Sequence, residues 1–187
     1  MPLTQPAPRN KIHDRLIECE GFQREDGLWD IEGHLVDTKT YSFSNSHRGE
    51  VPAGQPVHEM WLRIRIDDEL LIHDVEAAMD YHPYRICPRI TVNFQRLKGL
   101  KIGRGFRRKV AERVGHVEGC VHLQELLGPM ATTAFQTLAG HRYRSAQQDP
   151  DYRPAFLNTC HAHASDSEVI LEFWPRWYTG DKEVAVK

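Results

Sequence analysis

Hydrophobic and polar residues alternate with a period of two over two stretches in the first half of the chain. The stretches are GLWDIEGHLVDTKTYSF (residues 27–43) and VHEMWLRIRIDDELLIHDVEAAMDY (residues 57–81). Such alternation is typical of strands with one buried face. Asp67 and Asp68 interrupt the second stretch, which therefore predicts an antiparallel hairpin. Residues 44–56, rich in Gly, Pro, Ser and Asn, predict a loop, and residues 12–26 are compatible with a strand or with one turn of helix.

The period changes to that of a helix after residue 87. Residues 88–99, 103–116 and 120–143 have apolar residues three and four positions apart, which predicts three helices. The last of these is expected to bend near Gly128 and Pro129, because proline removes a backbone hydrogen bond.

The C-terminal part returns to short apolar runs. The segment CHAHASDSEVILEFWPRW (residues 160–177) predicts a small β-hairpin around an Asp-Ser turn. The order of strands, then helices, then a hairpin predicts a single α+β domain over residues 1–187, with an antiparallel meander packed by three helices on one face. Residues 1–10 are expected to be flexible, and residues 144–155 to form a linker to the hairpin.

Composition and charge narrow the class of protein. The chain has 187 residues, of which 40% are hydrophobic and 27% are charged, as in an ordinary globular domain. Its net charge of −2 gives no general attraction to nucleic acid or anionic lipid. The basic run at 96–109 is interpreted as the solvated face of an amphipathic element. No apolar run approaches the roughly 20 residues that cross a bilayer, and the N-terminus has no secretion signal. We therefore expect a cytoplasmic protein with reduced thiols, and neither nucleic acid nor membrane as a partner.

Two cysteines lie where helices are predicted to begin. Cys87 precedes the first predicted helix and Cys120 opens the third. The helix dipole stabilises a thiolate at such a position, and the thiolate is the form that binds metals. The alternative is that both are small buried residues, which is common for free cysteines.

His122, Glu125 and Asp37 offer further metal-binding chemistry. His122 and Cys120 converge if Cys120 lies at the cap of the helix, and this pairing suits zinc or iron. The ordinary interpretation of Asp37 is an ion pair with Lys39 on a solvated strand face. The alternative is that Asp37 completes a four-ligand set of Cys87, Cys120, His122 and Asp37. Glu125 shares a helix face with His122 and is the candidate general base of an enzyme.

Other chemistries have less support in the sequence. His161 and His163 lie two apart on a predicted strand, a spacing that also occurs by chance among eleven histidines. Neither a phosphate-binding loop nor a nucleophile elbow is present, and there is no zinc-protease motif. Nucleophilic catalysis would use Cys87 or Cys120 with His122 and an acid, and the spacing does not favour it over metal binding.

Several segments together resemble a bacterial family described only as a domain of unknown function. The likeness rests on GHLVDTKTYSF, GQPVHEMWLRIRID, PYRIC followed by LKGLKIGRGF, and GCVHLQELLGPMATTAFQ, and it spans about residues 27–177. The core GC-x-H-L-x-E-L (residues 119–126) is its most distinctive part. The family implies kinship and no established activity.

A more distant likeness is to the U-type (NifU-like) iron–sulfur cluster scaffold proteins. The order of elements is similar, and Cys87, Cys120, His122 and Asp37 fall near positions where that family holds zinc or a nascent cluster. Here Val121 separates the cysteine from the histidine, and the first loop has no cysteine. The resemblance therefore implies a mononuclear site, and a three-cysteine cluster site is incomplete.

Three functions follow as hypotheses. The first is a scaffold-like protein that holds one Zn or Fe ion through Cys87, Cys120, His122 and Asp37. The second is a metal-dependent hydrolase or lyase with an open coordination position and Glu125 or Asp37 as general base. The third is a metal-free binding module. A partner protein or a homodimer is compatible with all three, since four tryptophans are available to line an interface.

Overall fold

The structure is a computed structural model that describes residues 3–146 and 152–181. The chain divides into two compact units, Met1–Gly140 and His141–Lys187, which are described in turn. The predictions of flexible residues 1–10 and of a linker at 144–155 fall partly on residues 1–2 and 147–151, which lie outside the described residues. Across the described ranges, no helix combines the length and apolar character that crossing a bilayer requires.

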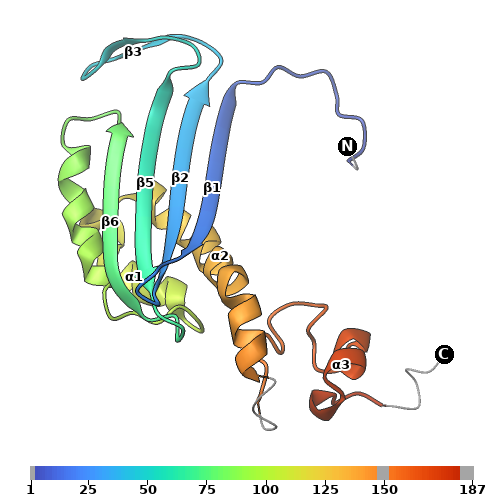
Figure 1. The fold of residues 1–187 in the computed structure, drawn as a ribbon. Coiled ribbons are helices and arrows are strands. Elements are labelled where there is room, and N and C mark those ends of the chain that lie inside the picture. Colours follow the sequence, from blue (N-terminus) through green and yellow to red (C-terminus); the bar gives the residue numbers. More distant parts are fainter. Residues whose placement is uncertain (1–2, 147–151, 182–187) are drawn as a thin grey trace. The chain divides into compact units, whose positions relative to one another are not determined.

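The first unit is built on a four-stranded antiparallel sheet (Figure 1). Its order is β1 (His13–Gln23), β2 (Trp29–Lys39), β5 (Pro56–Ile66) and β6 (Ile72–Tyr81), which confirms the predicted meander and the hairpin at its end. The segment at 12–26 is thus a strand. Because β1 lies at the edge of the sheet and is exposed along most of its length, its sequence lacks a clean alternation.

A second, two-stranded sheet stands where only a loop was predicted. It consists of β3 (Phe43–Asn45) and β4 (Gly49–Val51). The turn forms because Asn45 Oδ1 accepts hydrogen bonds from the backbone N–H groups of His47 and Arg48, at 2.8 and 3.0 Å. Gly49 then takes a positive φ of 77°, which glycine adopts without strain.

Helices cover one face of the large sheet, as the α+β prediction requires (Figure 1). They are η1 (Cys87–Leu97), α1 (Phe106–Val114), the single turn η2 (His116–Glu118) and α2 (Val121–Ala146). The first has 3₁₀ rather than α geometry. Helix α2 continues through Pro129 without a break. It also includes residues 144–146, which were predicted to begin the linker.

The core lies between this helical layer and the sheet. Alternate residues of β2 and β5 are buried, as their pattern predicted, and they meet the apolar faces of η1, α1 and α2. Helix α2 approaches β2 closely at Gly33, where a Cβ atom would lie only 2.7 Å from Met130 Sδ. The largest fully buried side chains of the core include Phe94, Ile31, Leu35, Met60, Leu62, Ile64 and Leu126.

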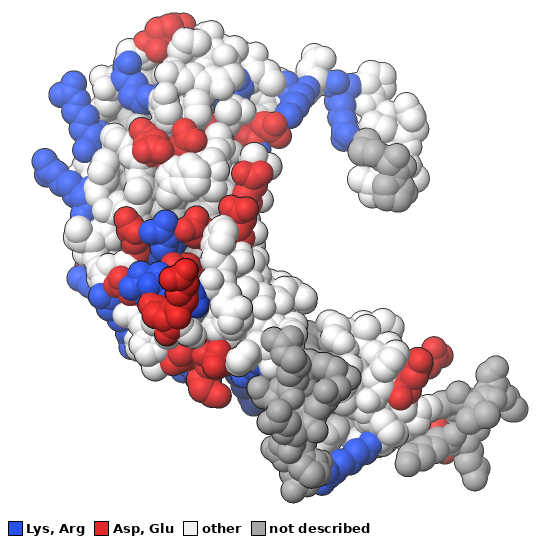
Figure 2. Space-filling view, viewed as in Figure 1, with Lys and Arg blue, Asp and Glu red and all other residues white. Residues whose placement is uncertain are grey.

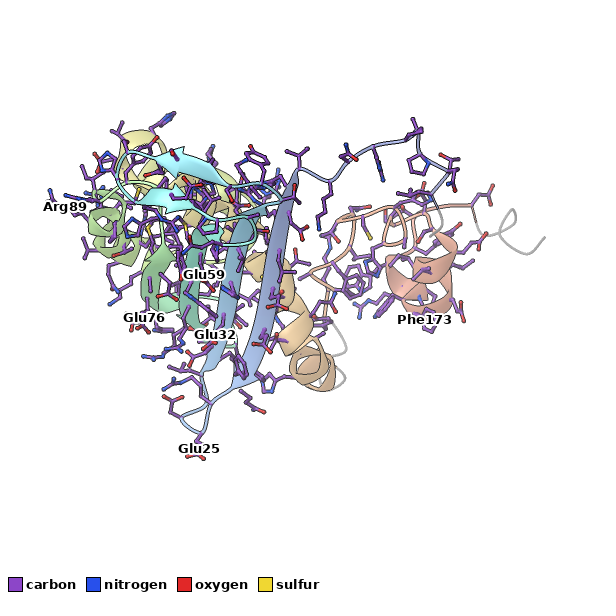
Figure 3. All side chains as sticks on the ribbon, turned by 90° about the horizontal axis from the view of Figure 1, so that it is seen from above. Glu25, Glu32, Glu59, Glu76, Arg89 and Phe173 are labelled. Carbon is purple, nitrogen blue, oxygen red and sulfur yellow. The ribbon has the colours of Figure 1, made fainter. Side chains whose placement is uncertain are left out.

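The other face of the sheet carries paired charges (Figure 2). Arg63, for example, donates to Glu32 on β2 at 2.7 Å and to Glu76 on β6 at 2.9 Å. Figure 3 labels both glutamates on their strands. Polar residues therefore follow the alternation of the strands across the whole sheet.

The second unit corrects one prediction. Where a C-terminal hairpin was expected, the described residues form α3 (Glu168–Phe173) and the short η3 (Pro175–Trp177). Ser167 caps α3 by accepting a hydrogen bond from the Ile170 N–H at 3.3 Å, and Ile170 is fully buried. A short apolar run such as VILEF fits a helix or a strand equally well, and here the serine cap favours the helix. His161 and His163 lie in turns rather than on a strand.

Candidate metal centre

Three side chains form a row across the sheet on its helix-covered face. The strand register places Asp37 of β2 directly opposite Arg15 of β1 and His58 of β5. Asp37 belongs to the same face as the buried Leu35, two residues earlier, and the β2–β5 register shifts just after it. The row therefore lies at the end of the core where the regular pairing of β2 stops.

Asp37 is the centre of this row. It is the buried charged residue of the described core, at 1% exposure. Its Oδ1 accepts from Arg15 Nε at 2.7 Å and lies 3.1 Å from His13 Nε2. Its Oδ2 accepts from Arg15 Nη2 at 2.7 Å and lies 3.1 Å from His58 Nδ1. A buried carboxylate needs such partners, because an unpaired charge in the core is costly.

His122 completes the site from the first turn of α2. Its Nε2 lies 3.7 Å from Asp37 Oδ2, and its ring stacks on that of His58 with centroids 3.8 Å apart. One donor atom from each of Asp37, His58 and His122 lies within 4.8 Å of the other two, and this is the group of three metal-ligating side chains found among the described residues. Residues 37, 58 and 122 thus converge, although they are remote in the sequence.

Glu125 lies beside this group. It follows His122 by three positions on α2, so both share a helix face, and Arg15 Nη1 donates a hydrogen bond to its carboxylate. Arg15 consequently links the buried Asp37 to Glu125, whose side chain is 45% exposed. The predicted general base is therefore at the solvent-facing edge of the site.

The two predicted cysteine ligands lie in different places. Cys120 caps α2, because its carbonyl accepts the first helical hydrogen bond from Gln124 N–H. Its Sγ lies 3.9 Å from Nδ1 of His122, the ring nitrogen other than the one nearest Asp37. Cys87 is the first residue of η1 and is half-buried; it does not belong to the group of three. Ligation by either cysteine stays a prediction.

The surroundings control the charge of the site. Burial lowers the pKa of His58 to about 4, helped by the neighbouring His122 and opposed by Asp37. Burial and the Arg15 guanidinium also lower the pKa of His122. Burial alone would raise the pKa of Asp37, but the hydrogen bonds and charge of Arg15 outweigh it and lower the pKa. Near neutral pH the site therefore contains one carboxylate and two uncharged imidazoles.

The two distances from Asp37 Oδ2 to the histidine nitrogens are close to those between ligand atoms around a small metal ion. A tetrahedral ion with bonds of about 2.0–2.1 Å to nitrogen and oxygen holds its ligand atoms about 3.3–3.4 Å apart. The distances of Asp37 Oδ2 to His58 Nδ1 and to His122 Nε2, 3.1 and 3.7 Å, bracket this value. Two imidazoles and a carboxylate are a ligand set used for zinc and for non-haem iron. Three protein ligands leave at least one coordination position for water or substrate.

Sequence reasoning singled out Asp37, His122 and Glu125, which the structure brings together, and it missed His58 and Arg15. A signal for His58 was present. It shares the parity of Met60, Leu62, Ile64 and Ile66, so the alternation of β5 directs it to the buried face. A histidine on that face needs a polar partner. Arg15 had no comparable signal, because residues 12–26 did not predict a strand unambiguously.

Comparison with known proteins gives one match. The sequence pattern of a protein family, described as a protein of unknown function (DUF2889), matches residues 13–136. This range is well over half of the chain, and it contains every residue of the candidate site. No curated protein and no solved structure matches the sequence. The chain therefore belongs to the DUF2889 family, as its resemblance to a family of unknown function indicated.

Proposed function

We propose that this protein binds one Zn or Fe ion through Asp37, His58 and His122. The observation that carries the proposal is the spacing of the donor atoms, which bracket the separation around a tetrahedral ion. The ion would lie at the end of the core, held by two strands and the first turn of a helix. Ligands on such regular elements are positioned more precisely than ligands on loops.

The protonation of the two histidines supports the same proposal. An imidazole binds a metal through the lone pair of an uncharged ring, so a protonated histidine has to release a proton first. The pKa of His58 is lowered to about 4, and that of His122 is also lowered. Near neutral pH both rings are therefore in the form that binds metals, and only a small free energy is lost to deprotonation.

Arg15 does not have to leave when an ion binds. A carboxylate offers about four lone-pair positions, of which Arg15 occupies one on each oxygen of Asp37. The ion takes the position between Asp37 Oδ2 and the ring nitrogen of His58, in place of the contact between these two atoms. Arg15 then orients the ligating carboxylate, as outer partners of metal ligands commonly do.

The open coordination position favours a reactive or exchangeable ion over a purely structural one. Structural zinc sites are usually closed by four protein ligands, whereas catalytic sites have three and a water molecule. A metal-dependent hydrolase or lyase is therefore the second candidate function. Glu125 supports it, since this carboxylate stands beside the ligand His122, is solvent-accessible and is held by Arg15. It would serve as the general base that deprotonates the metal-bound water.

The likeness to U-type scaffold proteins supports a carrier role for the same ion. In that arrangement Cys87 and Cys120 would act as ligands alongside His122 and Asp37. The first proposed ligand set is Asp37, His58 and His122, whereas the scaffold-like set replaces His58 with Cys87 and Cys120. Separate substitutions of His58 and of Cys87 therefore distinguish the two sets.

Metal analysis of protein purified without a histidine tag tests the proposal. We expect about one Zn or Fe ion per chain in the wild type, and loss of the ion in Asp37→Asn and His58→Ala. His34→Ala is the matched control, because His34 is on β2 but on the opposite face, stacked on Trp61. Retention of the ion in His58→Ala together with its loss in Cys87→Ala would replace the proposed ligands with the cysteine set.

A chelator distinguishes the metal-free alternative. If the protein binds an ion, removal of the ion lowers the melting temperature, because a ligand that binds only the folded state stabilises it. An unchanged melting temperature and a metal content near zero would overturn metal binding in favour of a binding module. If an ion is present, hydrolytic activity that Glu125→Gln removes without loss of metal favours the enzyme over the carrier.

A further inference from the structure

A second group of metal-ligating atoms lies on the other side of His122. Cys120 Sγ is 4.0 Å from Met60 Sδ and 3.9 Å from His122 Nδ1. Met60 is 1% exposed, and Cys120 is half-buried. Apart from Asp37, two pairs of nearby residues provide the side chains of both groups. His58 and Met60 are two apart on β5 and share its buried face, while Cys120 and His122 lie at the start of α2.

The spacing of these atoms fits a three-coordinate ion. With bonds of about 2.3 Å to sulfur and about 2.0 Å to nitrogen, a trigonal ion holds two sulfur atoms about 4.0 Å apart, and a sulfur and a nitrogen atom about 3.7 Å apart. The observed distances of 4.0 Å between the sulfurs and 3.9 Å from Cys120 Sγ to His122 Nδ1 agree with this arrangement. Both distances from Cys120 Sγ are therefore those of a three-coordinate ion.

The chemistry of the donors selects the kind of ion. A thiolate and a thioether are soft ligands, which prefer Cu(I), whereas zinc and iron sites rarely use methionine sulfur as a main ligand. We propose that Cys120, Met60 and Nδ1 of His122 form a binding site for Cu(I). This site is distinct from the one at Asp37, and it does not require that the Asp37 site be occupied.

The shared imidazole makes the two sites compete. A neutral imidazole has one lone pair, on whichever nitrogen lacks the proton. If Nε2 of His122 holds an ion beside Asp37, Nδ1 carries the proton and cannot hold copper. His122 thus binds a Zn or Fe ion on one side or a Cu(I) ion on the other, and bound zinc should weaken the binding of copper.

Titration of the untagged full chain with Cu(I) against a colorimetric Cu(I) chelator, without oxygen, tests the proposal. Met60→Leu keeps the volume of the buried side chain and removes the sulfur ligand, while Cys120→Ser removes the thiolate. Loss of a residue that only hydrogen-bonds a metal ligand weakens metal binding roughly 10- to 100-fold. Because Met60 and Cys120 would bind the ion directly, each substitution should weaken Cu(I) binding by more than this. The matched controls are Met130→Leu and Cys19→Ser, whose sulfur atoms are elsewhere in the core; they should bind Cu(I) as the wild type does.

Asp37→Asn separates this proposal from the one for zinc or iron. It should remove the Zn or Fe ion and bind Cu(I) with the affinity of the metal-free wild type, whereas Met60→Leu should retain the Zn or Fe ion and lose affinity for Cu(I). X-ray absorption of the copper-loaded wild type should show two sulfur neighbours and one nitrogen neighbour, and one sulfur fewer in Met60→Leu. This spectroscopic comparison decides the case if Cys120→Ser fails to fold. Equal Cu(I) binding by the wild type, Met60→Leu and Cys120→Ser would overturn the site, as would a copper spectrum without sulfur neighbours.

Discussion

Asp37 and His58 face each other across neighbouring strands, with Oδ2 and Nδ1 3.1 Å apart at the buried end of the sheet. This contact joins the strand that carries the one buried carboxylate of the described core to a neighbouring strand that carries an imidazole. The stability of the site and the metal binding that we propose for it both depend on the charge of these two groups. Three predictions follow from it and from the packing of α2, and a fourth concerns the cap of α3.

Arg15→Gln should destabilise the protein and make its stability depend more strongly on metal than that of the wild type. The substitution leaves the buried carboxylate of Asp37 without its main counter-charge, and breaking a buried ion pair costs about 3–5 kcal/mol. Urea denaturation without metal should show a loss near the lower end of this range, since Arg15 is itself one third exposed. A saturating divalent ion should restore part of the loss, because it provides a new counter-charge. Equal losses with and without the ion would contradict this prediction.

Acidification should destabilise the metal-free protein in a defined range of pH. The pKa of His58 is lowered from 6.5 to about 4 in the folded state, so the unfolded chain binds a proton between these values and the folded chain does not. Stability is therefore complete above about pH 6.5 and falls toward pH 4, by about 1.4 kcal/mol per pH unit for each such histidine. His122, whose pKa is also lowered, adds to the slope.

Urea denaturation at several pH values measures this slope. His58→Gln should make it shallower, because glutamine does not titrate. An equally steep slope in this variant would show that other groups cause the acid sensitivity.

Gly33→Ala should destabilise the packing of α2 on β2. The added Cβ would lie 2.7 Å from Met130 Sδ and 2.9 Å from Met130 Cγ, so the helix or the methionine has to move. Overpacking of this kind costs about 1–3 kcal/mol. Gly128→Ala is the control and should instead stabilise the protein. The nearest atom to its added Cβ is 3.8 Å away, so there is room for the methyl group. Alanine within a helix is also more favourable than glycine by about 1 kcal/mol. Thermal unfolding of both variants tests the pair, and a loss at both positions would contradict it.

Ser167→Ala should destabilise α3 in the second unit. The hydroxyl oxygen of Ser167 accepts the hydrogen bond from Ile170 N–H, and loss of such a cap costs about 1 kcal/mol. Circular dichroism of thermal unfolding measures the effect. Ser167→Asp should restore only part of the loss, because aspartate accepts the hydrogen bond from Ile170 N–H but cannot donate the one that Ser167 Oγ gives to the Ala162 carbonyl.

The strands and their buried faces were predictable because one face of the sheet packs on helices and the other is polar. Alternation in β2 and β5 therefore identified both the elements and the direction of each side chain. The residues of β1 show no such alternation, because an exposed edge strand has no face that must be apolar. Their sequence therefore did not distinguish a strand from a turn of helix. At residues 160–177 the pattern gave the wrong element, because a short apolar run does not distinguish a helix from a strand.

The candidate site was predictable only in part, because it depends on strand register. Asp37 and His122 attracted attention through their residue types and neighbours. Their proximity, however, follows from the alignment of Arg15, Asp37 and His58 across three strands and from the place where α2 begins. Spacing along the chain does not contain this information, and the same limit explains why the cysteines were favoured over His58.

The convergence of residues 37, 58 and 122 also has a consequence for biosynthesis. A ribosome makes the chain from its N-terminus, and the two strand ligands emerge long before His122, which stands in the first turn of α2. A nascent chain that ends before this helix has only an incomplete pair of donors. If the protein binds an ion as proposed, its capture would have to wait until most of the family's matched region has been translated, and a truncated product would leave the ribosome without it.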